Sequence, residues 1–232
     1  MIIKQLIDED FINYKKASMF IGFPTCTFKC EKDAKCKGMC QNSELYKSPD
    51  IEISIDSICD RYINNPLTTA IVCGGLEPFD SFDDLYELIK TLRLIYKCDD
   101  DIVVYTGYYD YEIKQKLIKL QVFKNIIIKY GRYIPNKHGR IDEVLGIKLV
   151  SDNQYAEILK PNTFRTKIVQ NTDIKLVETI KESLENNDGY CPCRVEKTSD
   201  TKCMCKEFKD SFLNNIETEC HCGLYYSIIV RN

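Results

Sequence analysis

Short apolar runs alternate with longer amphipathic stretches through the first 150 residues of the chain. Four runs rich in β-branched and aromatic residues are closed by glycine or polar residues, which predicts strands at 18–23, 70–75, 102–107 and 125–130. Between them, apolar residues recur every three or four positions, which predicts helices. This alternation favours an α/β fold with a mostly parallel sheet. Since only about four or five such units are present, we expect an open or partial (βα) barrel.

Helix caps and apolar faces define the expected helices more closely. Ser54 and Asp173 are suited to be N-caps, and the helix after Asp173 is expected to end at 186–189. The inward faces of four helices are, in chain order, Ile55, Ile58, Cys59 and Tyr62; Phe82, Leu85, Leu88, Leu92 and Ile95; Ile113, Leu117 and Leu120; and Ile174, Val177, Ile180 and Leu184. The segment 160–171 has no clean period. We therefore expect a domain at 1–160, a connection at 161–172 and a small module at 173–232.

Charge and hydropathy exclude several classes of partner. The 32 Lys and Arg residues nearly balance 35 Asp and Glu residues, so we expect no nucleic acid and no membrane surface as partner. The first 20 residues contain acids and no small-residue cleavage site, which is not typical of a signal peptide. No apolar run is long enough to span a bilayer. We expect a soluble, cytoplasmic protein.

The cysteines change this picture of an ordinary α/β protein. There are 13 of them, with four between Cys26 and Cys40 and six between Cys191 and Cys222. In a reducing compartment, clustered cysteines are more often metal or redox sites than a disulfide framework. Cys59, Cys73 and Cys98 have no partner motif and are expected to be inert thiols.

The first cysteine group follows the strand at 18–23, where the carboxyl end of a parallel strand usually carries chemistry. Cys26 and Cys30 are spaced CxxxC, and Cys40 begins a Cys-Gln-Asn segment. Three thiolates can hold a [4Fe–4S] cubane and leave its fourth iron open. The next strand ends in Gly-Gly-Leu-Glu at 74–77. Glycines allow a ligand to approach the backbone closely, and a carboxylate can hold an ammonium group.

The motifs CTFKC…CQN, GGLEP, VVYTGY and LGIKLVSDNQ, in that order, resemble the radical S-adenosylmethionine (SAM) activating enzymes of anaerobic ribonucleotide reductases. The resemblance covers residues 1–160 and implies a function as a glycyl-radical activase. It implies the cluster ligands Cys26, Cys30 and Cys40, and the SAM-binding residues Gly74, Gly75, Glu77, Thr106 and Gly107.

Two departures from the family pattern leave alternatives open. Nine residues, instead of two, separate the second and third cysteines, and the insertion contains Cys36, a competing third ligand. We prefer Cys40 because its Cys-Gln-Asn context matches the family's last cysteine. Leu76 lengthens the usual GGEP turn, which affects the register of Glu77. The structural alternative is a zinc site formed by Cys26, Cys30, Cys36 and Cys40.

The second cysteine group contains three Cys-x-Cys pairs, CPC, CMC and CHC, within residues 191–222. Six thiols exceed the four that one cubane needs, and two spare thiols beside a cluster can form a redox-active disulfide. The alternative is zinc binding by the six cysteines.

This pattern resembles the catalytic chain of ferredoxin:thioredoxin reductase over about residues 173–226, which implies a small, mainly helical domain. The resemblance implies the cluster ligands Cys191, Cys203, Cys205 and Cys220. It also implies that Cys193 and Cys222 form the disulfide pair, with Cys193 facing the protein substrate and His221 as the nearby proton donor.

The resemblances together predict an oxidoreductase with two [4Fe–4S] clusters that uses SAM. It would generate a glycyl radical on a partner enzyme, an anaerobic ribonucleotide reductase, and would reduce disulfides through its C-terminal module. Expected further partners are a ferredoxin- or flavodoxin-type electron donor and a thioredoxin-like protein. The alternative is mainly a ferredoxin-dependent disulfide reductase whose N-terminal domain relays electrons or docks a partner without cleaving SAM. A zinc-binding interaction protein is a third possibility.

Overall fold

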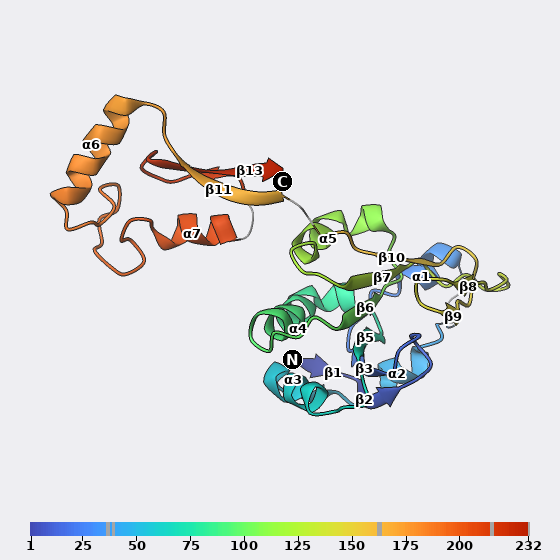
Figure 1. The fold of residues 1–232 in the computed structure, drawn as a ribbon. Helices are drawn as coiled ribbons and strands as arrows, with labels where there is room; N and C mark the ends of the chain where they lie inside the picture. Colours follow the sequence, from blue (N-terminus) through green and yellow to red (C-terminus); the bar gives the residue numbers. More distant parts are fainter. Residues whose placement is uncertain (36–37, 39, 162–163, 214–215, 232) are drawn as a thin grey trace. The chain divides into compact units, whose positions relative to one another are not determined.

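The structure, a computed structural model, describes residues 1–232 except 36–37, 39, 162–163, 214–215 and 232 (Figure 1). It divides into two compact units, Met1–Pro161 and Asn162–Asn232. The first unit contains five α-helices among its described residues, and the second contains α6 and α7.

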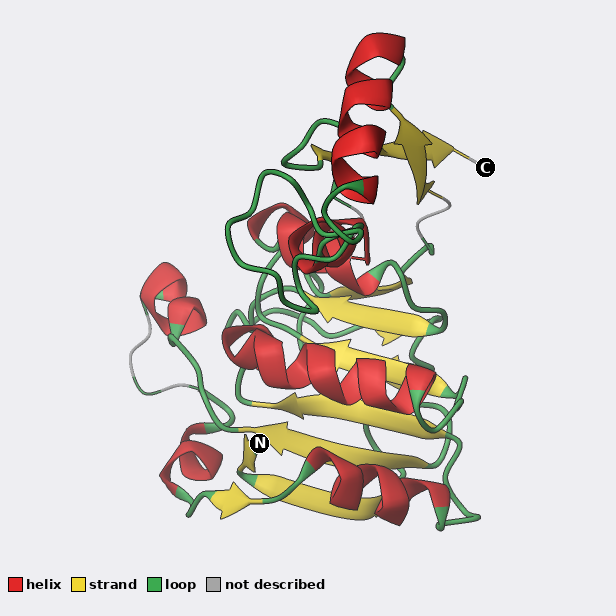
Figure 2. Cartoon of the chain, turned by 90° about the vertical axis from the view of Figure 1, so that its left-hand side faces the viewer, coloured by secondary structure: helices red, strands yellow, loops and turns green. Residues whose placement is uncertain are grey.

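A six-stranded sheet with the order β10-β7-β6-β5-β3-β2 forms the centre of the first unit (Figure 2). Its strands are β2 (Gln5–Asp10), β3 (Ser18–Phe23), β5 (Ala70–Gly75), β6 (Asp101–Tyr105), β7 (Ile126–Tyr130) and β10 (Tyr155–Ile158). The four central strands β3, β5, β6 and β7 are parallel, and β2 and β10 are antiparallel to their neighbours. The four apolar runs therefore form adjacent parallel strands, as predicted.

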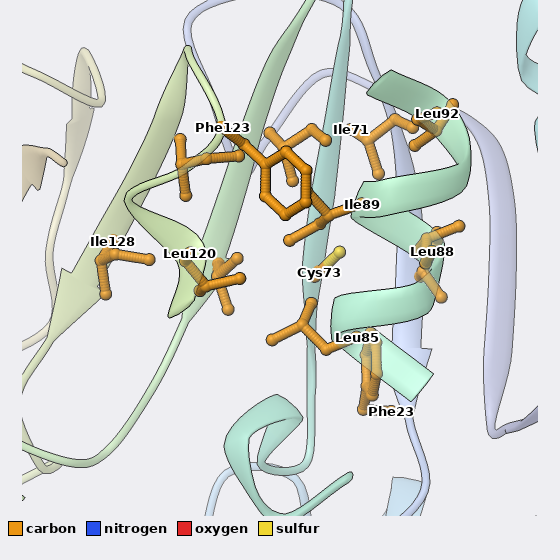
Figure 3. Close-up of a cluster of buried hydrophobic side chains, with 14 of the residues drawn as sticks. Phe23, Ile71, Cys73, Leu85, Leu88, Ile89, Leu92, Leu120, Phe123 and Ile128 are labelled. Carbon is orange, nitrogen blue, oxygen red and sulfur yellow. The ribbon is translucent and has the colours of Figure 1, made fainter. Parts of the chain in front are cut away.

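Three helices cover one face of this sheet (Figure 2): α3 (Ile55–Ile63), α4 (Phe82–Leu94) and α5 (Lys114–Leu120). Leu85, Leu88 and Ile89 of α4 pack on the sheet around Cys73 (Figure 3). The Ser54 cap of α3 is confirmed, because its hydroxyl accepts a hydrogen bond from the Ser57 amide at 3.0 Å. The inward placement of Ile95 is wrong, since α4 ends at Leu94 and Ile95 is 71% exposed.

The opposite face of the sheet is covered by loops and a short hairpin of β8 (Ile141–Asp142) and β9 (Ile147–Lys148). Tyr14, Leu145 and Leu149 belong to the apolar cluster on this face. The parallel strands follow one another without a reversal of order, so their crossover helices share one face. Among the described strands, β2 and β10 each pair on one side only, and a partial barrel stays a prediction.

Short elements complete the first unit. They are β1 (Ile2–Ile3) paired with β4 (Ile51–Glu52), helices α1 (Lys29–Ala34) and α2 (Ser43–Lys47), and 3₁₀ turns at Pro78–Ser81 and Asp110–Glu112. Helix α1 lies in the loop after β3 and carries Cys30.

The second unit combines helices α6 (Ile174–Glu185) and α7 (Lys206–Leu213) with a three-stranded antiparallel sheet. Its strands have the order β11 (Phe164–Gln170), β13 (Tyr225–Arg231) and β12 (Thr218–Glu219). Asp173 caps α6 as predicted, because its carboxylate accepts from the Leu176 amide at 3.2 Å.

Three expectations for this unit differ from the structure. The inward placement of Ile174 is wrong, since this first residue of α6 is 71% exposed. The expected connection at 161–172 contains β11, and the expected mainly helical module carries a sheet. Residues 164–170 have no alternating pattern of their own, but they pair with β13 along all seven positions. The strand therefore depends on a partner about 60 residues away, which a local pattern does not reveal.

Candidate functional site

A cavity of about 350 Å³ lies at the edge of the sheet where the parallel strands end. Its walls include residues that follow β3, β5 and β6, as expected for a parallel α/β fold. Seven of the residues predicted for the cluster and SAM line it: Cys26, Cys30, Cys40, Gly75, Glu77, Thr106 and Gly107. Gly74 lies within β5 and does not border this cavity; a Cβ there would meet the Phe20 ring at 3.1 Å.

The cysteine loop after β3 is fastened to the turn after β5. The Glu77 amide donates to the Thr25 carbonyl at 2.8 Å, and the Thr27 amide donates to the Asp80 carboxylate at 2.8 Å. The hydroxyls of Thr25 and Ser81 lie 2.7 Å apart. These bonds bring Cys26 and the Glu77 turn to the same cavity although about 50 residues separate them in the sequence.

Cys40 reaches the cavity through its own contacts. Its amide donates to the Glu31 carboxylate of α1 at 2.8 Å. The side-chain amide of Asn42 donates to the Gly75 carbonyl, so the Cys-Gln-Asn segment is attached to the end of β5. Cys36 lies outside the described residues, and the choice of Cys40 over Cys36 as third ligand stays a prediction.

The three thiols are suited to a metal cluster. Backbone amides donate to two of them, from Phe28 to Cys26 Sγ at 3.2 Å and from Asn42 to Cys40 Sγ at 3.4 Å. Burial raises the pKa of Cys26 to about 12 and also raises the pKa of Cys30. A thiolate in such a place needs the charge of a metal, and amide hydrogen bonds to sulfur are typical of iron–sulfur sites. The residues therefore fit a cluster.

Glu77 is held rigidly at the wall of the cavity. Its carboxylate is 5% exposed and accepts from the Gly107 amide at 2.8 Å and from the Phe79 amide at 3.1 Å. Burial raises its pKa to about 7, although these amides oppose the rise. A Cβ on Gly107 would lie 3.6 Å from both Cys30 Sγ and Glu77 Oε2, so the absent side chain leaves space between thiol and carboxylate. The extra Leu76 thus leaves Glu77 facing the cavity.

Gly75 is required by the backbone itself. It has a φ of +81°, and a Cβ there would lie 2.7 Å from the Gly22 Cα of β3. Any side chain at this position would displace β3. The glycine therefore allows the sheet to close beside the cavity.

Lys129, which was not predicted as a site residue, projects into the cavity from β7. Its ammonium group is buried and donates to the Gly131 carbonyl at 3.3 Å. Burial lowers its pKa to about 8, while the nearby Glu77 and Cys30 act in the opposite direction. A lysine inside the apolar run 126–130 was the available signal.

Ion pairs that the sequence did not reveal hold both ends of α1. The Arg132 guanidinium donates two hydrogen bonds to Glu112, at 2.8 and 2.6 Å, and lies 2.7 Å from Asp33 of α1. Lys29, at the start of α1, also bonds Glu112. Since Cys30 lies between Lys29 and Asp33, this network fixes the helix that carries it.

The cysteines of the second unit also gather in one place. Cys191, Cys205 and Cys220 are buried, Cys203 and Cys222 are half-buried, and Cys193 is exposed. The sulfurs of Cys220 and Cys222 lie 3.5 Å apart, and the Tyr225 amide donates to Cys220 Sγ at 3.1 Å. The amides of Cys191 and Cys203 bond the carbonyls of Thr201 and Gly189, which joins the CPC and CMC segments.

Burial is the largest electrostatic effect on this second group, and neighbouring thiols add to it. Burial raises the pKa of Cys203, and the adjacent Cys220, Cys191 and Cys205 raise it further. Burial also raises the pKa of Cys222 to about 12. Clustered buried thiols of this kind are suited to metal binding. His221 is exposed to solvent.

Among the described cysteines, neither group is arranged around one ion. In the described part of the chain, no three or more His, Cys, Asp or Glu side chains are placed to hold a single metal ion. A cubane differs from a single ion because each cysteine binds a different iron. The twelve described cysteines are all free thiols.

Comparison with known families agrees with the chemistry of the first cavity. Residues 16–154 match the family model of the 4Fe-4S single cluster domain, so the chain is an iron–sulfur protein. The match spans more than half of the chain, which therefore belongs to this family. It includes Cys26, Cys30 and Cys40, and it favours a [4Fe–4S] cluster over zinc in the first unit. No curated protein and no solved structure matches the chain.

Among the described helices, none combines the length and apolar character needed to cross a bilayer.

Proposed function

We propose that the chain is a cytoplasmic radical SAM activase that generates a glycyl radical on a partner enzyme, an anaerobic ribonucleotide reductase. The main support for this proposal is that one cavity, at the carboxyl edge of the parallel strands, is lined by Cys26, Cys30, Cys40 and Glu77. Three thiolates and one nearby carboxylate are what a cluster with an open iron and an amino-acid cosubstrate require.

The positions of the side chains are compatible with the proposed roles. Cys26, Cys30 and Cys40 hold the cluster. A cluster held there would supply the one electron that cleaves the sulfonium bond of SAM into methionine and a 5′-deoxyadenosyl radical, and this radical would take a hydrogen atom from the partner's glycine. Glu77 receives the ammonium group of SAM. Lys129, in the same cavity, pairs with the carboxylate of SAM. Thr106 and Gly107 complete the wall beside Cys30.

We propose a second [4Fe–4S] cluster in the C-terminal unit, held by Cys191, Cys203, Cys205 and Cys220. Three of these four thiols are buried, and Cys193 is exposed, as a thiol that attacks a partner's disulfide must be. Cys222 lies beside Cys220 and is suited to be the resolving thiol.

Disulfide reduction in this unit requires two electrons and two protons. A ferredoxin- or flavodoxin-type donor would deliver the electrons one at a time. The exposed His221 lies next to Cys222 in the sequence and would supply a proton. The substrate is a thioredoxin-like protein or the cysteine pair of the reductase itself.

The test is radical formation on the partner. The reconstituted, reduced chain is incubated with SAM and a candidate anaerobic ribonucleotide reductase, and electron paramagnetic resonance is recorded. We expect a glycyl-radical doublet with wild type and none with Cys30→Ala. The variant Cys193→Ser is the matched control, and it should retain the doublet.

A second function is favoured by one observation, the separate compact unit with an exposed thiol at Cys193. In that case the chain is mainly a disulfide reductase. Reduction of a thioredoxin-like disulfide without SAM, together with no radical on any candidate partner, would support this second function over the activase.

A further inference from the structure

A second cavity, of about 690 Å³, lies in the same unit as the first. Among the described residues, Cys30 is the single one that borders both cavities. Most of the remaining wall comes from the turn that carries Tyr109 and Tyr111 and from residues 134–136. A ligand in this second cavity would therefore lie next to the reaction centre without occupying it.

Stacked planar groups form one wall of the second cavity. The rings of Tyr109 and Tyr111 are stacked, with centroids 5.9 Å apart and planes 10° from parallel. Tyr109 is held in place, because its hydroxyl accepts a hydrogen bond from Asn153 at 3.3 Å and its amide donates to Glu112 at 2.9 Å. Tyr111 is 72% exposed, so the face of its ring away from Tyr109 is free for a further planar group.

The two cations that border the second cavity are both used within the protein. Arg132 pairs with Glu112 and Asp33, and Lys29 pairs with Glu112. Since these two acids also border the cavity, its described wall carries two charges of each sign. No cation of this wall is left over to hold a phosphate or a carboxylate.

The charged side chains next to the cavity favour the same conclusion. Asp110, between the two tyrosines in the sequence, is exposed and has no ion pair among the described residues. Lys137 follows Asn136 but is paired with Asp152 at 3.3 Å. Lys32 and Lys35 of α1 do not border the cavity. An unpaired acid near the stacked rings disfavours an anionic ligand, so the cavity suits a neutral one.

Asn136 supplies a directional polar contact at the wall. It borders the cavity, is exposed, and its side-chain amide makes no hydrogen bond within the described part of the chain. An asparagine amide can donate to N7 of an adenine and accept from its amino group at the same time. Aromatic rings on which a base stacks, with such an amide nearby, are a common means of recognising an adenine.

We propose that the second cavity binds a neutral adenine nucleoside, and that this nucleoside is 5′-deoxyadenosine, the product formed in the first cavity. The adenine ring stacks on Tyr111 and pairs with the amide of Asn136. 5′-Deoxyadenosine keeps the adenine of SAM and lacks its charged methionine part. Binding forms and breaks no covalent bond. The source of the nucleoside rests on the proposed function, whereas the nature of the site rests on the cavity itself.

A separate product site would free the first cavity for the next molecule of SAM. SAM and 5′-deoxyadenosine both contain an adenosine group, so a product that remained in the first cavity would compete with SAM. Because the two described linings share only Cys30, both cavities can be occupied at the same time.

The test is calorimetric titration of 5′-deoxyadenosine into the reconstituted, oxidised chain with saturating SAM, which an oxidised cluster does not cleave. We expect one nucleoside to bind per chain. Tyr111→Ala should weaken binding about tenfold through the loss of stacking, and Tyr111→Phe, which keeps the ring, should bind like wild type. Tyr96→Ala, just after α4, removes a ring outside both cavities and should have no effect. Iron content shows that each variant keeps its cluster.

Two further measurements test the contact to the base and the charge of the ligand. Asn136 has a φ of +62°, which glycine adopts freely, so Asn136→Gly removes the amide without straining the turn. This variant should bind 5′-deoxyadenosine about fivefold more weakly. Adenosine 5′-monophosphate, which adds a phosphate to the same base and sugar, should bind wild type at least about tenfold more weakly than 5′-deoxyadenosine.

Four outcomes would overturn the inference. Complete displacement of the nucleoside by SAM would mean that both ligands use the first cavity. Unchanged binding in both Tyr111→Ala and Asn136→Gly would place the nucleoside elsewhere. Equal binding of adenosine 5′-monophosphate would contradict the charge argument. Adenosine that binds more than about tenfold better than 5′-deoxyadenosine would give the nucleoside another source.

These measurements do not require SAM cleavage, so the two failures can be told apart. A chain that binds the nucleoside at Tyr111 but forms no 5′-deoxyadenosine from SAM would support the site and contradict the proposed function. A chain that cleaves SAM and binds no nucleoside at Tyr111 would contradict this inference alone.

Discussion

Removal of the Arg132–Glu112 pair should destabilise the first unit and loosen the helix that carries Cys30. The pair has two hydrogen bonds of 2.8 and 2.6 Å, and the side chains of Arg132 and Glu112 are 7% and 12% exposed. We predict that Glu112→Gln and Arg132→Gln each lower the free energy of unfolding. The double variant should lose much less of it than the two single variants lose together.

The magnitude follows from the ionisation of Glu112. A pKa lowered from 4.5 to about 2 corresponds to about 3 kcal/mol in favour of the charged form. Water in the open cavity screens the pair and reduces this figure. We therefore expect a coupling energy of about 1–2 kcal/mol between the two positions. The exposed pair Glu44–Lys47 is the matched control, with an expected coupling of about 0.3 kcal/mol.

The sign of the pH dependence is fixed by the direction of the shift. Because the folded pKa of Glu112 lies below the ordinary value of 4.5, its contribution is fully present above that value. It is lost as the pH falls from 4.5 toward 2. The stability difference between wild type and Glu112→Gln should shrink over that interval and be constant at higher pH.

Hydrogen exchange of peptides from α4 reports the opening of the first unit alone, which matters because the chain has two units. Wild type, the two single variants and the double variant are compared at neutral pH. A coupling energy below about 0.5 kcal/mol would refute the proposed role of the pair. Iron content of the same variants should fall at the first cluster only.

Three other experiments test the assignment of the sites. Gly107→Val fills the space beside Cys30, so SAM binding measured by calorimetry should be lost while the hydrogen-exchange rates of α4 stay unchanged. Retained binding would show that Gly107 does not line the SAM site. Cys40→Ala should remove about half of the iron and Cys36→Ala none, taking one four-iron cluster per group; the reverse result would make Cys36 the third ligand. Cys222→Ser should trap a mixed disulfide with a thioredoxin-like partner on a non-reducing gel, and Cys193→Ser should not; the opposite pattern would exchange the two roles.

The parallel sheet could be predicted because its signals are local. Runs such as 18–23 and 126–130 are apolar, β-branched and bounded by breakers, and Ser54 and Asp173 cap helices where their side chains reach a free amide. The cavity followed from the same pattern, since parallel strands place the loops that carry Cys26 and Glu77 at one edge.

The features that were missed depend on long-range contacts. Strand β11 is defined by its pairing with β13, and Lys129 is placed in the cavity by the register of β7 with β6. The ion pairs of Arg132 join positions 20 residues or more apart, without a pattern that marks them. A sequence shows which residues carry charge, but the fold decides which charges meet.

Cleavage of SAM is the most direct test of the proposed function. The chain is reconstituted anaerobically with iron and sulfide, reduced with dithionite and incubated with SAM, and 5′-deoxyadenosine is quantified by mass spectrometry. We expect wild type to produce it, Glu77→Gln to produce much less with its iron content retained, and Cys30→Ala to produce none. If a fully loaded and reduced wild-type chain forms no 5′-deoxyadenosine, the cavity at Cys30 is not a radical SAM site.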